Sequence, residues 1–432
     1  MSLKTRISPP HGQAPLAAGV ALLVLGASLA AAYPLDGYER TGIRRLWAYA
    51  PERSAELGGP TLPAGARLQH DDIRLRLTDL ADYDLGEADA ELQRGLEAIF
   101  AGRDTSYSVA LLDITEPQAP RFAALREDET YLPGSIGKLL VATGLFDALA
   151  RAYPDPTDRL EALRASWIIA DDFGQTDSHS VPVVDVAAGT LEHRPITPGD
   201  GFTLFEWIDH ALSPSSNAAG ATSWREAMLL RHFGSRYPVP ESEWKTWLAE
   251  TPKSELTELS LDTLEAPLRA AGLETSHLRQ GTMFTSGGRS YVPGVRSLAS
   301  PRQLLRLLLR MEQGILVDEF SSLEIKRLMY FTRRRYRYAV SPALNNAAVY
   351  FKSGSFYRCQ NEEGFQCRQY AGNVDNIMNS VAIVENPAVP EPGQTQRVYL
   401  VAMMSNVLRK NSAEVHRDLA TAIDELIASG HD

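Results

Sequence analysis

Three short segments of the sequence carry residue types that can perform acyl transfer: 135–138 (SIGK), 215–217 (SSN) and 352–354 (KSG). A serine hydroxyl is a poor nucleophile until a neighbouring base removes its proton. A lysine can be that base when burial or a second cation lowers its pKa. Each segment alone occurs by chance in many long chains. Because all three are present, each on the type of element that the chemistry needs, the sequence predicts attack by a serine on a carbonyl.

The first segment supplies the predicted nucleophile and base. Ser135 follows Pro133-Gly134 at the start of a predicted helix, so its hydroxyl lies near unpaired N–H groups and the positive end of the helix dipole. Lys138 lies three residues on, on the same helical face and within reach of that hydroxyl. Lys352 is the expected second cation. If the segment 135–138 is considered alone, the alternative to a catalytic site is a capped helix with an exposed lysine.

Two other catalytic loops are excluded by the spacing around Ser135. A phosphate-binding loop needs a glycine five positions before the Gly-Lys pair and Ser or Thr after it. Leu132 and Leu139 occupy those positions. A nucleophile elbow needs G-x-S-x-G, and Pro133 stands where the first glycine belongs.

The other two segments supply groups that contact a substrate. Ser215 and Asn217 follow a predicted helix and lie in a turn, where both residue types are also common for conformational reasons alone. We expect Ser215 to relay a proton to the leaving nitrogen and Asn217 to hold a substrate carbonyl. Lys352 ends a strand and supplies a cation for a substrate carboxylate. The N–H groups of Ser355 and Ser135 are predicted to bind the tetrahedral oxyanion.

The elements around these segments predict an α+β fold. Strand-like runs occupy 106–114 and 121–128, which form a hairpin, and then 347–352, 377–384 and 398–404. We therefore expect an antiparallel five-stranded sheet built from both chain ends and flanked by helices, with an all-α subdomain inserted at about 135–345. The predicted helices are 87–103, 135–152, 203–212, 223–233, 261–271, 300–314 and 412–429.

The order S-x-x-K, S-x-N and K-[ST]-G resembles that of penicillin-binding proteins and class A β-lactamases. The resemblance covers roughly residues 87–430, including the order of strands and helices, and implies a β-lactamase/transpeptidase-like catalytic domain at 86–432. It implies that Ser135 is the acylated serine and Lys138 its base. The second motif then comprises Ser215 and Asn217, and the third comprises Lys352, Ser353 and Gly354.

One feature of class A β-lactamases is missing from the sequence. Those enzymes carry a glutamate, in the loop between two helices, that activates the deacylating water. The corresponding segment, 278–300, contains no Asp or Glu. Glu265 superficially resembles the missing group but lies within the preceding helical pattern. An insertion at 221–260 also separates the chain from a compact β-lactamase. The sequence thus favours acylation through Lys138 over fast β-lactam hydrolysis.

Three functions follow from this comparison. The leading one is a serine acyl hydrolase that resembles the DD-peptidases and acts on carboxylate-terminated cell-wall peptides, such as those ending in D-Ala-D-Ala, or binds penicillin. The second is a class A β-lactamase whose water-activating group has not been located. The third is a non-catalytic module that binds peptidoglycan or a protein partner. Esterase or amidase activity on other substrates is also compatible with such a fold.

The N-terminus predicts export. Lys4 and Arg6 precede an uncharged run at 14–32 that ends in three alanines, which is the anatomy of a secretory signal peptide. The alternative is an uncleaved membrane anchor, because the run is close to the roughly 20 residues needed to cross a bilayer. Both place the rest of the chain in the periplasm or on the outer face of the inner membrane. Residues 33–85 are rich in Pro, Gly and charge, and we expect an extended lead-in there.

Cysteine content and charge restrict the remaining possibilities. Cys359 and Cys367 are the only cysteines, and in an oxidising compartment a pair so close in sequence predicts a disulfide, with two free thiols as the alternative. Neither HExxH nor CxxC is present, and we expect no metal and no cofactor. The net charge of −11 argues against a nucleic-acid partner. The arginine-rich run at 333–337 is expected to be a solvated helix end or loop rather than an anion-binding patch.

Overall fold

A computed structural model describes residues 36–57, 63–175, 177–332 and 335–431 of the chain. The predicted signal peptide or anchor at 1–32 lies outside the described residues. Within those four ranges, no helix combines the length and the apolar character needed to span a bilayer.

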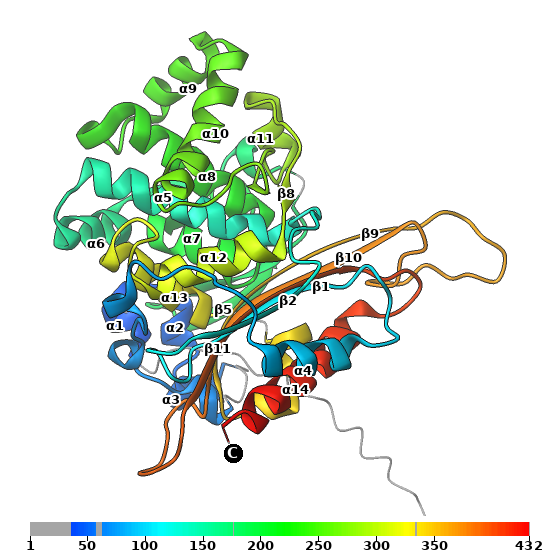
Figure 1. Ribbon diagram of the computed structural model, residues 1–432. Coiled ribbons are helices and arrows are strands. Elements are labelled where there is room, and N and C mark those ends of the chain that lie inside the picture. The colour runs from blue at the N-terminus through cyan, green and yellow to red at the C-terminus, as the bar shows by residue number, and fades with distance from the viewer. Residues whose placement is uncertain (1–35, 58–62, 176, 333–334, 432) are drawn as a thin grey trace, which may run out of the picture.

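The centre of the molecule is an antiparallel sheet of five strands in the order β2-β1-β11-β10-β9, which confirms the predicted α+β fold (Figure 1). Its strands come from both ends of the chain, and β1 pairs with both β2 and β11. The strands are β1 (Ser108–Asp113), β2 (Arg121–Leu125), β9 (Ala348–Arg358), β10 (Asp375–Asn386) and β11 (Arg397–Asn406).

Both faces of the sheet are covered. Every residue of β1 is buried, which explains why this strand has a continuous apolar run instead of alternation. Helices α4 (Ala90–Phe100) and α14 (Ser412–Ser429) cover one face. There Leu111 packs in one cluster with Leu96 of α4 and Ile423 of α14. Leu112 points the other way, into the larger core shared with the helical block.

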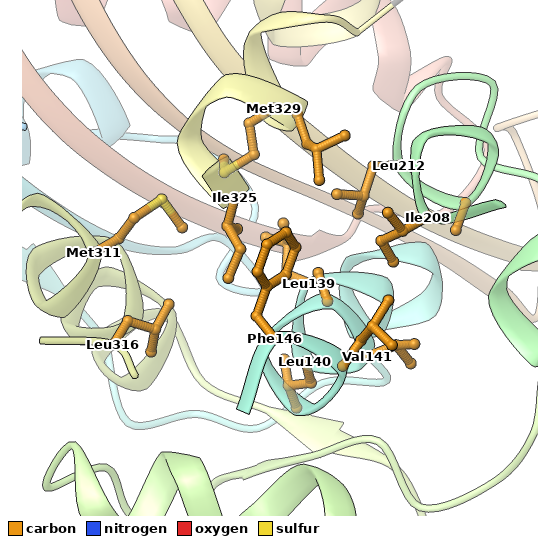
Figure 2. Close-up of a cluster of buried hydrophobic side chains, with 14 of the residues drawn as sticks. Leu139, Leu140, Val141, Phe146, Ile208, Leu212, Met311, Leu316, Ile325 and Met329 are labelled. Atoms are coloured by element: carbon orange, nitrogen blue, oxygen red, sulfur yellow. The ribbon is translucent and has the colours of Figure 1, made fainter. Parts of the chain in front are cut away.

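Helix α5 (Gly137–Ala152) is the central element of that helical block. All of its residues from Gly137 to Leu149 are buried, as expected for a helix that is apolar on every side. Figure 2 shows Leu139, Leu140 and Phe146 of α5 among side chains of the helices around it. These neighbours are α7 (Leu204–Leu212), α12 (Pro301–Glu312) and α13 (Glu319–Tyr330). The packing fixes the start of α5, where the first motif lies.

Two of the remaining helices of the block begin earlier than predicted, whereas those at 156–165, 241–250 and 286–291, like α13, were not predicted from the sequence. Helix α8 begins at Asn217 instead of 223 because Ser216 caps it, accepting a hydrogen bond from Ala219 N. The predicted helix at 261–271 begins earlier, at Lys253. The elements are α6 (Pro156–Ala165), α8 (Asn217–Phe233), α9 (Glu241–Glu250), α10 (Lys253–Ala270) and α11 (Ser286–Tyr291).

The expectation of an all-α insertion was wrong in one respect, because the block also contains three two-stranded sheets. These strands were missed because segments of two to six residues carry little periodicity. The sheets pair β3 (Trp167–Ile169) with β6 (Gly201–Thr203), β4 (Ser180–Asp185) with β5 (Thr190–Pro195), and β7 (Leu278–Arg279) with β8 (Leu298–Ala299).

The described part of the N-terminal segment is helical and packed where an extended chain was expected. It contains α1 (Gly37–Thr41), α2 (Arg44–Ala48) and α3 (Pro51–Ser54). Ile43 and Leu46 belong to the main core, as do Ile73 and Leu77 farther along. Helices of four or five residues are too short to show a hydrophobic period, which is why these three were not predicted.

Candidate active site

Ser135 lies in a tight turn between the sheet and the buried helix. The turn is a 3-10 helix (Gly134–Ile136) that leads directly into α5. Gly134 has φ +56°, a left-handed conformation that favours glycine. The turn packs against edge strand β9, and a β-carbon built on Gly134 would lie 3.0 Å from Ser355 N. The nucleophile predicted from the sequence is therefore partly buried and held beside the third motif.

Lys138 is completely buried in the first turn of α5 and makes three close polar contacts. Its Nζ lies 3.0 Å from Ser135 Oγ, 2.7 Å from Ser215 O and 2.7 Å from Asn217 Oδ1. Burial lowers its pKa to about 7, against the opposing influence of the Asp177 carboxylate. A neutral amine here keeps N–H groups for the oxygens of Ser215 and Asn217. Its lone pair can then accept a proton from Ser135.

The second motif is a strained turn that meets both lysines. Ser215 has φ +65°, a conformation that a non-glycine residue keeps only when surrounding contacts hold it. Its hydroxyl accepts a hydrogen bond from Lys352 Nζ at 2.9 Å, while its carbonyl oxygen faces Lys138. The start of α8 is fixed by Asp177, whose Oδ2 accepts hydrogen bonds from Ser216 Oγ (2.7 Å) and Ala218 N (2.9 Å).

The third motif lies on β9, and its backbone packs against the turn that bears Ser135. A β-carbon on Gly354 would collide with Pro133 O and lie 3.0 Å from Ser135 N, so the strand can approach only because this residue has no side chain. Lys352 also donates a hydrogen bond to Ser353 O at 3.0 Å. The hydroxyl of Ser355 accepts one from Arg337 Nη2 at 3.0 Å.

The three motifs line one cavity of about 850 Å³. Ser135, Ser215, Asn217, Ser353 and Ser355 all contribute to its wall. The structure therefore brings together residues predicted from three distant segments. Among the described residues, the wall carries no Asp or Glu; its aromatic members are Phe284, Tyr336, Phe356, Tyr357 and Tyr370.

No family model matches the chain, and no curated protein matches it in sequence. Among solved structures, the TLA-3 extended-spectrum β-lactamase aligns over 78% of this chain and 96% of its own, with 14% identity and a TM-score of 0.50. This chain has a β-lactamase fold.

Two further structures align at somewhat lower TM-scores. A variant of PBP-A, solved as an acyl-enzyme complex with penicillin G, covers 80% of this chain over its whole length, with 13% identity and a TM-score of 0.49. A β-lactamase from Chitinophaga pinensis covers the same share, also over its whole length, with 14% identity and a TM-score of 0.48.

Within this β-lactamase fold, the segment 278–300 contributes a wall without carboxylates to the cavity, and Arg289 is the charged residue of that wall. It supplies Gln280, Thr282 and Phe284, and the Phe284 ring lies 4.8 Å from Lys138 Nζ. Glu265 lies inside α10, as expected from the sequence, and its carboxylate binds Arg269 and Arg279. No carboxylate from these residues therefore reaches the cavity.

The arginine-rich run was interpreted wrongly from the sequence. Of its described members, Arg335 and Arg337 are only 2% and 4% exposed, whereas a solvated loop or helix end was expected. Arg337 has φ +59°, and its guanidinium lies 4.3 Å from the centre of the Tyr336 ring and 4.6 Å from that of Tyr370. The tyrosines near the arginines were the one sequence signal of this packing.

An acid–imidazole pair that was not predicted from the sequence lies beside the second motif. His179 lines the cavity, and its Nδ1 lies 2.6 Å from Asp177 Oδ1. Burial opposes ionisation of Asp177, but hydrogen bonds from His179, Ala218 N and Ser216 hold the pKa of this carboxyl below its usual range. No spacing rule identifies the pair, because its partners lie about 40 residues farther along the chain.

The predicted disulfide is present. Cys359 and Cys367 are joined within the connection between β9 and β10, directly after the third motif. In the part of the chain that the structure describes, no group of three or more His, Cys, Asp or Glu side chains is arranged to hold a metal ion.

Proposed function

We propose that this chain is a serine acyl hydrolase in which Ser135 forms an acyl-enzyme and Lys138 is the activating base. One observation carries the proposal: the Lys138 amine, with a pKa of about 7, lies 3.0 Å from Ser135 Oγ. The neutral amine removes the hydroxyl proton as Oγ bonds to the substrate carbonyl carbon. The carbonyl oxygen then becomes an oxyanion, which the N–H groups of Ser135 and Ser355 stabilise.

Ser215 completes the acylation step. Its hydroxyl lies 3.5 Å from Lys138 Nζ and 2.9 Å from Lys352 Nζ, so a proton taken up by Lys138 can pass through it to the leaving nitrogen. The C–N bond breaks, the electron pair of the oxyanion re-forms the carbonyl, and the acyl group remains as an ester on Ser135. In this scheme the side chain of Asn217 holds the carbonyl of the acyl side chain.

The charges around the cavity favour a substrate with a carboxylate. Lys352 and Arg337 supply positive charge on the β9 side, and no described Asp or Glu lines the wall. In this proposal Ser353 and Gly354 are the residues of β9 that contact the substrate. The substrate class we propose is therefore a carboxylate-terminated cell-wall peptide, as for a DD-peptidase, or a β-lactam. The N-terminal run at 14–32 would deliver the enzyme to the periplasm or tether it to the membrane there.

Rapid β-lactam hydrolysis is the less favoured alternative. Deacylation requires a base that activates water against the ester. The wall formed by 278–300 supplies amide, hydroxyl, aromatic and guanidinium groups but no carboxylate. We therefore expect a long-lived acyl-enzyme with penicillin. A non-catalytic binding module would not need a buried lysine with a pKa near 7.

Two reagents and one peptide test the proposal. The purified protein is incubated with a fluorescent penicillin, with a chromogenic cephalosporin and with a pentapeptide ending in D-Ala-D-Ala. Stable labelling and release of D-alanine, both lost in Ser135→Ala, support a DD-peptidase. As a matched control, Ser429→Ala removes a hydroxyl from the exposed last residue of α14 and should label normally. Rapid cephalosporin turnover would indicate a β-lactamase, and the absence of any adduct would contradict the proposal.

A further inference from the structure

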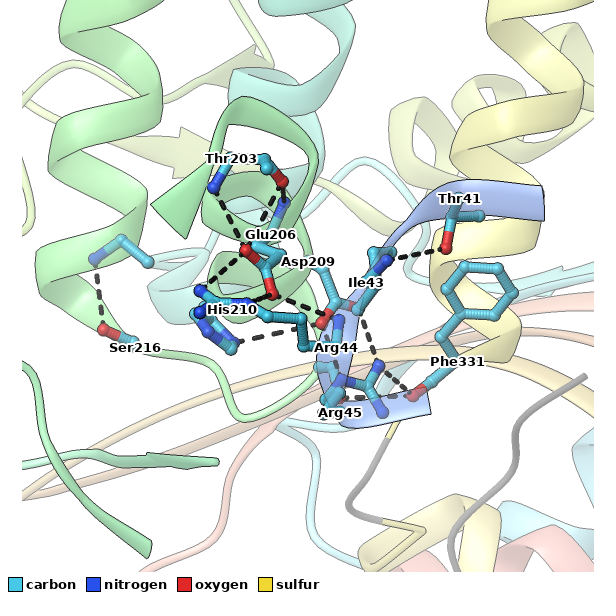
Figure 3. A network of polar contacts seen from close by, with 12 residues as sticks. Thr41, Ile43, Arg44, Arg45, Thr203, Glu206, Asp209, His210, Ser216 and Phe331 are labelled. Carbon is cyan, nitrogen blue, oxygen red and sulfur yellow. Dashed lines mark hydrogen bonds and ion pairs between the residues drawn. The ribbon is translucent and has the colours of Figure 1, made fainter. Parts of the chain in front are cut away.

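Two arginines join the N-terminal segment to α7, the helix that precedes the second motif. Arg45 of α2 and Asp209 of α7 are both completely buried and form a bidentate ion pair, with Nε–Oδ2 and Nη2–Oδ1 distances of 2.6 Å (Figure 3). Arg44 binds Glu206, one turn earlier on α7, at 2.8 and 2.9 Å. Bidentate pairs of this kind fix orientation as well as position.

The Arg45–Asp209 pair is connected through hydrogen bonds to the turn that bears Ser215. The Asp209 carbonyl accepts a hydrogen bond from Ser213 N at 2.7 Å. The Phe331 carbonyl accepts hydrogen bonds from both Ser213 Oγ (3.2 Å) and Arg45 Nη2 (2.8 Å). Arg45 thus shares the Phe331 carbonyl with Ser213 and also holds the side chain of Asp209, whose backbone carbonyl binds Ser213 N. The end of the turn is fixed by a hydrogen bond from Ser216 N to His210 O at 2.9 Å.

This support matters because the turn is strained. Ser215 adopts φ +65°, which costs on the order of 1–3 kcal/mol and persists only when neighbouring contacts determine it. In that conformation its carbonyl oxygen lies 2.7 Å from Lys138 Nζ. The side chain of Asn217, two residues later, lies at the same distance from the amine. If the turn relaxes, both oxygens move and water can reach the amine.

We propose that Arg45 is a positioning residue of the candidate active site, holding the turn 213–216 closed around the Lys138 amine. The inference rests on the proposed role of Lys138 as the base. It gives the N-terminal segment 36–57 a part in catalysis, although none of the described residues of that segment lines the cavity.

The charged groups around Lys138 and Arg45 determine whether loss of Arg45 raises or lowers the pKa of Lys138. Asp177, from the segment before β4, and Lys352, from β9, are the charged groups that face the second-motif turn and Lys138. Asp209 faces Arg45, with Glu206 and His210 beside it on α7. Because burial is what lowers the pKa of Lys138, opening the turn to water should raise that pKa toward its ordinary value and reduce the neutral fraction at pH 7.

The test measures the Lys138 pKa directly. The protein is labelled with lysine carrying ¹³C at the ε carbon, and the Lys138 signal is assigned by its loss in Lys138→Met. We expect Arg45→Met to raise the titration midpoint by about one unit or more and to slow penicillin acylation at pH 7 several-fold. Arg45→Lys should be intermediate, because an ammonium keeps the charge but not the bidentate geometry.

A second buried arginine provides the matched control. Arg159 is 5% exposed and binds Tyr153 O, Pro154 O and Asp318, none of which belongs to the turn. Arg159→Met should lower the thermal unfolding midpoint without moving the Lys138 titration. If Arg45→Met only destabilises the fold in the same way, and the Lys138 midpoint stays at the wild-type value, the proposal is overturned.

Two features of the design keep the result interpretable. If Arg45→Met does not fold, the double variant Arg45→Met/Asp209→Leu removes the uncompensated buried charge, and an unchanged Lys138 midpoint in that variant or in Arg45→Lys would refute the positioning role. The titration also does not depend on turnover. A wild-type protein that penicillin fails to acylate contradicts the proposed function, whereas a shifted midpoint in the variants still supports the role of Arg45.

Discussion

Gly354 on β9 passes so close to Ser135 that a single added methyl group would lie 3.0 Å from the serine backbone nitrogen. That nitrogen and the N–H of Ser355 are the donors proposed for the oxyanion. The separation between strand and turn therefore sets the geometry of the pocket in which the tetrahedral intermediate would form.

The first prediction concerns this separation. Gly354→Ala should force β9 away from the Ser135 turn and reduce the second-order rate of penicillin acylation by about 100-fold or more, because oxyanion donors act only at close range. Stopped-flow measurement with a fluorescent penicillin gives the rate. Gly86→Ala is the control, since a β-carbon there meets nothing within 4 Å. Equal rates for the two variants would mean that the strand does not help to form the site.

A second prediction removes the proposed base. Lys138→Met keeps the length and apolar character of the buried stem but cannot accept a proton, and acylation should fall by roughly 10²–10⁴-fold. The same change should stabilise the fold at pH 7 by on the order of a few kcal/mol, because the wild-type chain loses proton affinity at this lysine when it folds. Acylation rates and urea unfolding of both proteins test the two effects together.

The pH dependence of that stability difference has a definite sign. The pKa of Lys138 is lowered from 10.5 to about 7 in the folded protein. Between pH 7 and pH 10.5 the lysine is therefore protonated in the unfolded chain but neutral in the folded protein. The unfavourable contribution is thus largest below about pH 7 and disappears as the pH rises toward 10.5. The stability advantage of Lys138→Met should shrink over the same interval. A difference that is constant with pH would contradict the lowered pKa.

A third prediction is the pH profile of wild-type acylation. Only the neutral amine can accept the Ser135 proton, so the rate should fall about tenfold per pH unit below a midpoint near 7. Above that midpoint the rate should level off. A profile that is flat from pH 5 to 8 would exclude Lys138 as the base.

The fourth prediction uses Asp177, whose negative charge acts on the same lysine in the opposite direction to burial. In Asp177→Asn the amide oxygen can still accept hydrogen bonds from Ser216 Oγ and Ala218 N, but the charge is gone. The pKa of Lys138 should fall, and the acylation midpoint should move to lower pH. Asp185→Asn, at the exposed end of β4, serves as the control. Movement to higher pH would show instead that the turn had opened.

The fifth prediction concerns Arg337. Its guanidinium donates to Ser355 Oγ at 3.0 Å, and Arg337→Gln keeps a donor while removing the positive charge. We expect acylation by penicillin to weaken about 10- to 100-fold, mainly through the binding step. Acylation by the methyl ester of the same penicillin should change much less. Arg358→Gln, at the exposed end of β9, is the control, and equal losses for acid and ester would refute carboxylate recognition.

Much of the architecture could be predicted because the signals were local. The buried strands appeared as apolar runs, and the helix starting at Pro301 was predicted to within two residues from the Ser300 cap. The two-residue strands and the helices of the N-terminal segment could not be predicted in this way, since they are shorter than the pattern that would reveal them. The burial of Arg337 was missed for a different reason, because charged residues are buried only when distant partners surround them.

By itself, the sequence determined the contact between Ser135 and Lys138, because one helical turn places residues three apart on the same face. The sequence also determined that Ser353 and Gly354 would directly follow Lys352 on a strand. Only the tertiary structure decided that Lys352 would reach Ser215, 137 residues away, and that Arg45 would share the Phe331 carbonyl with Ser213 of the same turn. Those contacts depend on how α8 packs against α5 and on the register of β9 with β10. Such packing is set by the whole core at once, so no short stretch of sequence specifies it.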